Sequence, residues 1–339
     1  MASLSSVLIV DDEPAVRNVM ARWVSALGLH ARTAASAEEA LVALEAQRCD
    51  LAVIDLMMPG RDGLWLAGEL HRFHPQTAVV IATGYMDRIE GAKSDDSIAD
   101  LLIKPVARDR FAQALDRGRQ WREQVLEEIR WHAQLSVEVQ QRTRQIRDFV
   151  ERRALEGANE AEALISLAVE RMPETMAHAE RVGRYAQSVA RQLRAAADLN
   201  GLLETGARLH DIGKAAMPQA LLTKPSPLTA AERALMRRHV NVGAEITSAT
   251  RTLADVAPIV LASHEWFNGG GYPLRLSGEA IPLASRIIAV ADAYDAMTQD
   301  RSYRLRLRSS DAVAELVRGR GVQFDPVVLD AFTDLLARH

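Results

Sequence analysis

The chain has 339 residues, of which 48% are hydrophobic and 25% are charged, and its formal net charge is −4. This length suits two folded domains, and the slight acidic excess argues against a nucleic-acid-binding protein. The single cysteine, Cys49, excludes an internal disulfide framework and is typical of a reducing cytoplasm, where we expect the protein to act. We find neither a secretory signal pattern nor the run of about 20 apolar residues that a membrane span needs.

Short apolar runs alternate with amphipathic stretches through residues 1–120, which we take as the first domain. Pro14 is well placed to open one helix, and Ser36 with Glu39 forms a capping-box pattern for the next. Strands that alternate with helices indicate a parallel sheet. The predicted strands lie at residues 7–10, 51–54, 78–82 and 101–103.

Polar side chains follow each of these predicted strands, at the edge where open parallel sheets place their sites. Asp11, Asp12 and Asp55 would hold Mg²⁺ through carboxylate oxygens. Asp55 would act as a nucleophile toward a phosphoryl donor, and Thr83 and Lys104 would stabilise the phosphoryl oxygens. An acid that only solvates a loop is the commoner explanation for any one of them, but all four strand ends carry the required set.

These positions resemble those of a response-regulator receiver domain. The resemblance implies an α/β fold with a doubly wound five-stranded parallel sheet, a bound Mg²⁺ and phosphorylation by a cognate histidine kinase. Asp55, in Asp55-Leu56-Met57-Met58-Pro59-Gly60, matches the phosphoacceptor. Leu101 is a departure, because the family often has an aromatic switch residue three positions before the lysine. The other matches are Asp11 and Asp12 as the acidic pair, Thr83 as the hydroxyl residue and Lys104 as the lysine.

Residues 108–157 are predicted to form a helical linker. Between 108 and 150 there is no proline and one glycine, and a 3.5-residue rhythm predicts a long helix. We interpret it as a parallel coiled coil that makes a homodimer. The alternative is a helix packed on its own chain, which Trp121 and Trp131, off the seam, would support. The seam comprises Phe111, Leu115, Gly118, Arg122, Val125, Ile129, His132, Ser136, Val139, Thr143, Ile146 and Val150.

The most specific motif is His210-Asp211, within Leu209-His210-Asp211-Ile212-Gly213-Lys214. Adjacent ligands suit a site inside a helical bundle, where the aspartate bridges two metal ions and the histidine binds one. Lys214, four residues after His210, would share its helical face and favour an anionic substrate such as a phosphate. The alternative is a helix end, with Gly213 as a left-handed cap and Lys214 as a favourable charge.

Further candidate ligands are spread through residues 158–339, where the periodicity is helical throughout. Glu174 and His178 are four apart and share one helix face. Asp292 lies in an otherwise apolar helix, where a carboxylate is costly to bury unless it is paired or bound to metal. With His239 and His264 they make a set of imidazoles and carboxylates that suits Fe, Mn or Zn. Each one taken singly is more commonly a hydrogen-bonded core or surface residue.

The loop Asn268-Gly269-Gly270-Gly271-Tyr272-Pro273 follows directly after His264-Glu265. Three glycines permit positive φ angles and a close backbone approach to a ligand, and the Tyr-Pro end favours a shaped loop over a flexible turn. Together with His210-Asp211 and the Asp292 helix, this loop resembles the HD-GYP family over residues 158–339.

The resemblance implies an all-α domain with two or three divalent metal ions, most simply Fe or Mn, that hydrolyses cyclic di-GMP to pGpG and GMP. Lys214 matches a lysine that contacts substrate phosphate, and with Asp211 it would carry the catalytic role. Arg301 and Arg304 match basic residues that hold the dinucleotide phosphates. The signature loop residues are Gly271, Tyr272 and Pro273. The matching metal ligands are Glu174, His178, His210, Asp211, His239, His264 and Asp292.

Four positions depart from the HD-GYP pattern. Ser263 stands where the family usually has a histidine ligand, so one metal position loses a donor. Asn268 replaces the acid of the loop, Met176 replaces a glycine and Ser302 replaces a proline. The alternative to an enzyme is therefore a catalytically degenerate signalling scaffold that binds cyclic di-GMP or a protein.

We expect a phosphorylation-regulated phosphodiesterase whose partners are a histidine kinase and cyclic di-GMP. Other signalling proteins, such as diguanylate cyclases, are further candidate partners. A DNA-binding response regulator would need a basic helix-turn-helix, and the sequence offers only the basic run at 301–308, beside the predicted site.

Overall fold

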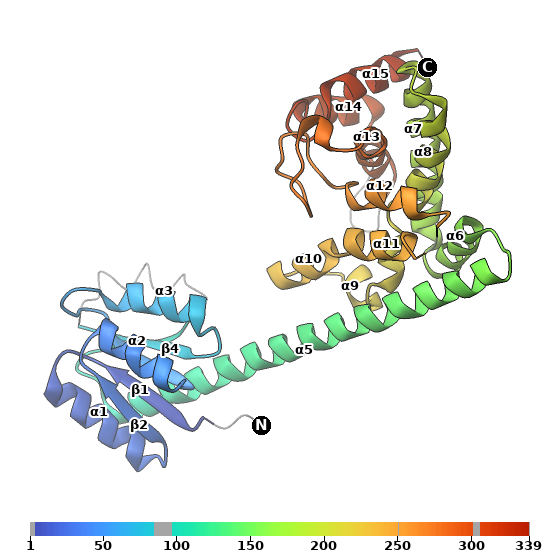
Figure 1. Cartoon of the computed structure of the whole chain (residues 1–339). Coiled ribbons are helices and arrows are strands. Elements are labelled where there is room, and N and C mark those ends of the chain that lie inside the picture. The colour runs from blue at the N-terminus through green and yellow to red at the C-terminus, as the bar shows by residue number, and fades with distance from the viewer. Residues whose placement is uncertain (1–3, 85–96, 250, 301–305, 339) are drawn as a thin grey trace. The chain divides into compact units, whose positions relative to one another are not determined.

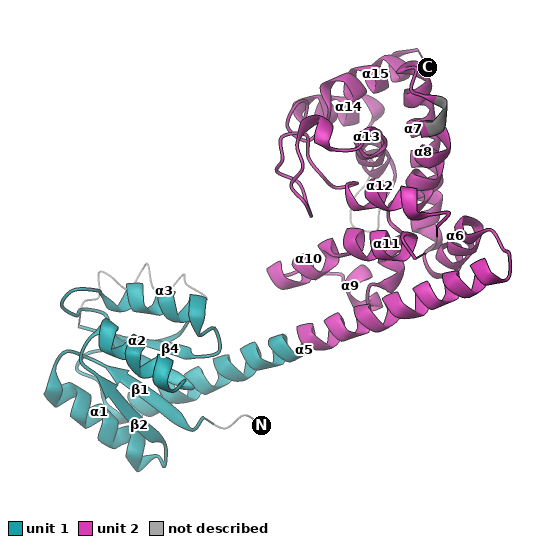
Figure 2. Cartoon of the chain, in the orientation of Figure 1, with its two compact units in different colours: residues 1–131 teal, residues 132–339 magenta. Residues whose placement is uncertain are grey.

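A computed structural model describes residues 4–84, 97–249, 251–300 and 306–338 of the chain. The chain divides into unit 1, residues 1–131, and unit 2, residues 132–339 (Figure 2). The division falls inside one long helix, so the predicted linker belongs to both units. Among the described residues, every helix is too short or too polar to cross a lipid bilayer.

Unit 1 contains the predicted five-stranded parallel sheet, with strand order β2-β1-β3-β4-β5. The four apolar runs of the sequence all lie within strands, which confirms those predictions. The fifth strand, β2, gives no apolar signal because it is an edge strand in which only Ala34 is buried. The strands are β1 (Ser6–Val10), β2 (His30–Ala34), β3 (Leu51–Asp55), β4 (Ala78–Thr83) and β5 (Ile98–Ile103).

Helices cover both faces of this sheet (Figure 1). One face packs against α1 (Pro14–Ala26) and the start of α5, and the other packs against α2 (Ala37–Ala46) and α3 (Gly63–Phe73). The Ser36 hydroxyl accepts a hydrogen bond from the Glu39 N–H at 3.2 Å, as the capping pattern predicts. The doubly wound arrangement brings the carboxyl ends of the strands to one edge.

The helix α5 runs from Arg108 to Leu155, which confirms the predicted long helix. Its first turns bury Phe111 against the sheet of unit 1, and its second half buries Val139 and Ile146 in a core of unit 2. Within unit 2 the seam is therefore packed on its own chain, as the alternative interpretation predicts. Residues 119–134 include no buried side chain, so a coiled-coil dimer would have only that stretch of the seam, and dimerisation stays a prediction.

Unit 2 is helical, and apart from two isolated bridges its described residues form no strand, as predicted. Two adjoining cores hold it together: one includes Ile287 and Phe332, and the other includes Leu209 and Ile246. The α-helices are α6 (Glu160–Arg171), α7 (Pro173–Gln192), α8 (Ala197–Leu209), α9 (Gln219–Leu222), α10 (Ala230–Arg237), α11 (His239–Thr247), α12 (Ala257–Leu261), α13 (Leu283–Thr298), α14 (Ser309–Arg318) and α15 (Pro326–Ala337). Short 3₁₀ helices are η2 (Ile212–Ala216), η3 (Ala254–Val256) and η4 (Gly278–Ala280).

Candidate functional site

The predicted acidic pocket of unit 1 forms at the carboxyl edge of the sheet. One carboxylate oxygen from each of Asp11, Asp12 and Asp55 lies within 4.8 Å of the others, close enough to share a cation. The Lys104 ammonium is 2.7 Å from Asp11 Oδ2 and 3.0 Å from Asp55 Oδ1. Thr83 is the last residue of β4 and is buried, so it lies at the carboxyl edge of the sheet, as the strand pattern predicts.

The ionisation of Asp55 follows from this setting. Burial raises the pKa of the carboxyl, and the opposing effect of the Lys104 charge does not cancel it. Asp11 and Asp12 add a further upward push on the Asp55 pKa, because neighbouring negative charges oppose ionisation. A divalent cation among the three carboxylates would relieve that repulsion, which fits the predicted Mg²⁺.

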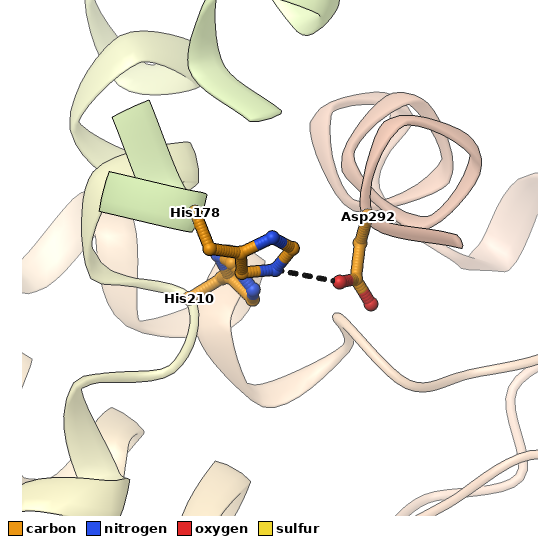
Figure 3. Close-up of side chains that lie close together, drawn as sticks. All are labelled: His178, His210 and Asp292. Carbon is orange, nitrogen blue, oxygen red and sulfur yellow. Dashed lines mark hydrogen bonds and ion pairs between the residues drawn. The ribbon is translucent and has the colours of Figure 1, made fainter. Parts of the chain in front are cut away.

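In unit 2 a first ligand group joins three helices. His178 comes from α7, His210 follows the end of α8 and Asp292 comes from α13 (Figure 3). One ligand atom from each lies within 4.8 Å of the other two. His178 Nε2 is 2.9 Å from Asp292 Oδ1. That spread is close to what ligands about 2 Å from one ion would have.

A second ligand group lies directly beside the first. It consists of Asp211, His239 at the start of α11 and His264 after α12, again with ligand atoms within 4.8 Å of one another. His239 Nε2 is 3.2 Å from Asp211 Oδ1 and 3.2 Å from His264 Nε2. Since His210 and Asp211 are neighbours, with His210 Nε2 3.5 Å from Asp211 Oδ2, the two groups meet at the His-Asp pair.

Hydrogen bonds that Nδ1–H donates orient three of the four imidazoles. His210 Nδ1 lies 2.7 Å from the Ala207 carbonyl oxygen, and His239 Nδ1 lies 2.8 Å from the Met236 carbonyl oxygen. His178 Nδ1 lies 2.6 Å from Asp295 Oδ2. An Nδ1–H that donates to an oxygen leaves Nε2 with its lone pair, which is the form that binds metal.

One buried atom tests whether these residues fit a metal ion. His210 is 1% exposed, and its Nε2 has no hydrogen-bond partner among the described residues. A buried polar atom without a partner is costly and calls for an explanation. A cation bound between His178, His210 and Asp292 would satisfy it, so the donor set fits a metal.

Two residues that the sequence analysis left without a role support the first group. Asp295 is fully buried, accepts from His178 and is held by Arg181 at 2.7 and 2.8 Å. This chain of carboxylate, imidazole and ligand site is the usual way in which proteins fix a metal-binding histidine. The signal was present in the spacing, because Asp295 and Arg181 each lie three residues after a ligand, on the same helix face.

The His-Asp segment is a helix end followed by a 3₁₀ turn, so the predicted shared helical face of His210 and Lys214 is wrong. The helix α8 stops at Leu209, and Lys214 instead meets Asp211, with Nζ 2.5 Å from Oδ2. Nor is Gly213 a left-handed cap. It is a point of close approach, because a Cβ there would lie 1.9 Å from the His239 carbonyl oxygen.

The glycine loop lies against the second ligand group. The Tyr272 ring stacks on the His264 imidazole, with centroids 5.2 Å apart and planes 12° apart. A Cβ on Gly271 would lie 2.2 Å from the backbone nitrogen of Trp266, so only glycine fits there. Glu265, to which the sequence analysis gave no role, is buried and accepts from the Leu274 N–H at 2.6 Å. The shaped loop that Tyr-Pro favours is therefore tied to a buried carboxylate.

Ser263 is buried, and its hydroxyl donates to the Val260 carbonyl oxygen at 2.8 Å. The hydroxyl hydrogen of Ser263 is therefore donated to the backbone one turn earlier. Glu174 is exposed in the first turn of α7 and is not brought into either ligand group. Its predicted role as a ligand stays a prediction. Arg301 and Arg304 lie outside the described residues.

Charge distribution sets the protonation states in the two groups. Burial lowers the pKa of His178, but its hydrogen bonds to Asp292 and Asp295 outweigh this and raise the pKa to about 9. Burial and the neighbouring His239 lower the pKa of His264 to about 4. Burial raises the pKa of Asp211, but the Lys214 charge and two histidines outweigh this and hold it well below its usual value.

Comparison with known proteins follows the same division of the chain. The response regulator receiver domain model matches residues 7–116, and the HD domain model matches residues 162–328. The cyclic di-GMP phosphodiesterase response regulator RpfG of Xanthomonas campestris is 34% identical, over 96% of this chain and 86% of the relative. A cyclic di-GMP phosphodiesterase of Thermotoga maritima is 29% identical, over 97% and 90%. The 3′3′-cGAMP-specific phosphodiesterase 2 of Vibrio cholerae is 37% identical, over 50% and 32%.

These matches agree with the geometry of both units. A receiver domain implies a phosphodonor such as a histidine kinase, and HD domains are metal-dependent, which agrees with the two ligand groups. The chain belongs to the family of response regulators that join a receiver domain to a C-terminal HD-GYP domain, the cyclic di-GMP phosphodiesterase response regulators.

Proposed function

We propose that this chain is a metal-dependent phosphodiesterase that hydrolyses cyclic di-GMP to pGpG and GMP. The observation that carries the proposal is the pair of adjacent three-ligand groups that meet at His210-Asp211. RpfG and the Thermotoga relative are named for cyclic di-GMP. The Vibrio relative named for 3′3′-cGAMP makes that dinucleotide the substrate to compare.

The residues of the chain divide the work. His178, His210 and Asp292 would hold one ion, and Asp211, His239 and His264 a second. This donor set suits Fe, Mn or Zn, and the resemblance to the HD-GYP family favours Fe or Mn. Bound metals would polarise phosphoryl oxygens and lower the pKa of water. Lys214, whose side chain is 29% exposed beside Asp211, would contact a phosphoryl oxygen from a fixed position. Tyr272 would limit water access by covering one face of His264.

The second candidate function is a signalling scaffold that binds cyclic di-GMP or a protein without turnover. Ser263 favours it, because its hydroxyl serves the backbone and the position offers no imidazole. The loss of one donor would weaken the binding of a third ion or of the ion in one of the two ligand groups. The His210-Asp211 pair itself is intact. The number of metal ions per chain therefore separates the two candidates.

We further propose that phosphorylation of Asp55 by a histidine kinase regulates unit 2 through α5, with Mg²⁺ held by Asp11, Asp12 and Asp55. The support is covalent continuity, since α5 is a single helix whose first turns pack in a core of unit 1 and whose second half packs in a core of unit 2. Homodimerisation through residues 119–134 of α5 belongs to the same proposal.

The test uses purified full-length protein with Mn²⁺ or Fe²⁺, and either cyclic di-GMP or 3′3′-cGAMP. We expect cyclic di-GMP to be cleaved to pGpG and GMP faster than 3′3′-cGAMP, and phosphorylation of Asp55 to change the rate. A silent native chain with an active Ser263→His variant would establish the degenerate scaffold. If neither chain cleaves a cyclic dinucleotide while both bind two metals, the phosphodiesterase proposal is wrong.

A further inference from the structure

A pocket of about 280 Å³ lies in unit 2, and none of the six residues of the two ligand groups lines it. Its walls come from the second half of α5, the end of α6, the 3₁₀ turn η2 and α9. No histidine and no aspartate lines it. This volume lies at the lower limit of the roughly 300–1,000 Å³ that small-molecule pockets occupy, so the pocket suits a ligand no larger than a mononucleotide.

Three cations from three different elements line this pocket: Arg142 of α5, Arg171 of α6 and Lys214 of η2. Arg171 has no ion-pair partner in the described part of the chain. Arg142 is held in place by the Met217 carbonyl oxygen at 2.9 Å and by Glu138 Oε1 at 2.6 Å. The balance of charge is positive, and guanidinium groups match phosphate oxygens in geometry.

The rest of the lining suits a base rather than a bare ion. Met172, Met217 and Leu222 supply apolar surface, and Gln145 and Gln219 supply amides that both donate and accept hydrogen bonds. Met172 and Met217 are buried, so this surface belongs to the core of unit 2. Methionine side chains adapt well to flat ligands.

We propose that this pocket is a second ligand site, which binds a phosphomonoester of nucleotide size. Arg142 and Arg171 grip the phosphate and the apolar wall receives the base. Lys214 links the pocket to the metal groups, because its ammonium is 2.5 Å from Asp211 Oδ2. A ligand in the pocket would therefore contact both α5, through Arg142, and Lys214, which pairs with Asp211. Only the source of the ligand, a hydrolysis product, rests on the proposed function.

The experiment is calorimetric binding of GMP and, separately, of inorganic phosphate to chelator-treated full-length protein. We expect GMP to bind, and Arg171→Ala and Arg142→Ala each to weaken binding by about 10-fold or more, as loss of a charge-assisted hydrogen bond would. Arg147→Ala is the matched control: it also lies on α5 and pairs with another element, Glu245 at 3.0 Å, but does not line the pocket.

The outcomes separate the alternatives. GMP binding that exceeds phosphate binding and depends on both arginines supports the nucleotide site, whereas equal affinities would limit the site to phosphate and overturn the base contact. No binding, or binding that Arg171→Ala leaves unchanged, overturns the proposal. Arg171 is exposed and has no ion-pair partner among the described residues, so that variant should fold. Arginine-dependent GMP binding by a chain that does not cleave cyclic di-GMP would leave this inference standing and remove the proposed function.

Discussion

The acidic pocket of unit 1 and the His-Asp centre of unit 2 both gather buried ionisable groups, but they hold them in different ways. In unit 1 a positive charge holds the carboxylates together, because Lys104 contacts both Asp11 and Asp55. In unit 2 an acceptor at Nδ1 fixes the orientation of the imidazole, as Asp295 does for His178. A cluster of carboxylates attracts any hard cation, whereas oriented imidazoles favour a metal ion that binds nitrogen ligands.

The largest effect should come from Asp211→Asn, which keeps the size of the side chain and removes the charge shared by Lys214 and His239. We expect cyclic di-GMP turnover to fall by about 100- to 1000-fold, together with loss of metal from the second group. Turnover and metal content measure it. The control Asp330→Asn removes an exposed carboxylate paired with Arg320 and should leave both unchanged. Normal metal content in Asp211→Asn would contradict the assignment of Asp211 as a required metal ligand.

A smaller effect is expected from Asp295→Asn, because Asp295 orients a ligand without being one of the group. Loss of such an outer partner typically weakens metal affinity by about 10- to 100-fold. Mn²⁺ titration of the metal-free chain would measure it. The matched control is Asp325→Asn, another buried carboxylate that pairs with an arginine, Arg286, at 2.6 Å, but not with an imidazole. Equal losses in both variants would indicate general destabilisation rather than loss of orientation.

Proton release on metal binding distinguishes the two sites further. In the metal-free chain the pKa of His178 is raised to about 9, so the imidazole holds a proton below that pH and must lose it to bind a metal. Affinity of the first group should therefore rise by about tenfold per pH unit as the pH approaches 9 and then level off. His264, with a pKa of about 4, releases no proton at neutral pH. Titrations in buffers of different ionisation enthalpy count the protons; no release at pH 7 would contradict the prediction.

The smallest effect concerns the attachment of α5 to unit 1. Asp100 accepts from Arg110 at 2.7 and 3.0 Å, and Asp100→Asn should lower the free energy of unfolding by on the order of 1 kcal/mol. Burial raises the pKa of Asp100, but hydrogen bonds from Arg110 outweigh this and lower it. The advantage over the asparagine variant is therefore full above the unfolded pKa of 3.8 and is lost as pH falls through the lower folded pKa.

Urea unfolding of unit 1 in the full chain, repeated at several pH values, measures this difference. Asp116→Asn serves as the comparison, because Asp116 pairs with Arg119 at 3.4 Å but is 68% exposed. We expect almost no change there. An advantage of Asp100 that persists well below its folded pKa would show that the ion pair is not its origin.

The sequence predicted most of the sheet and named all six residues that the structure gathers in the two ligand groups, because those signals are local. An apolar run ending in Asp55, or a dipeptide such as His210-Asp211, can be recognised without knowing what it contacts. The edge strand β2 was missed because exposure removes its apolar pattern. Glu265 and Asp295 were missed because their roles depend on partners that only folding brings near, namely the Leu274 N–H and the His178 ring.

The path of the chain after His210 was also beyond the sequence. A helix that continues and a helix that turns into a 3₁₀ segment can share the same five residues, and the choice depends on packing against α11. Lys214 consequently pairs with Asp211 and does not share the predicted helical face with His210. The second pocket escaped detection for the same reason, because Arg142 and Arg171 belong to different helices and each alone is an ordinary surface arginine.

The contact of Gly213 with α11 has a consequence for protein engineering. Gly213 approaches the His239 carbonyl so closely that no side chain fits between them, and the backbone nitrogen of Gly243 lies 2.6 Å from where a Cβ would stand. The spacing between His210-Asp211 and His239 is thus fixed by main chain against main chain. A designer who wished to change the metal preference of this scaffold would do better to exchange ligand side chains on the existing frame than to move the frame itself.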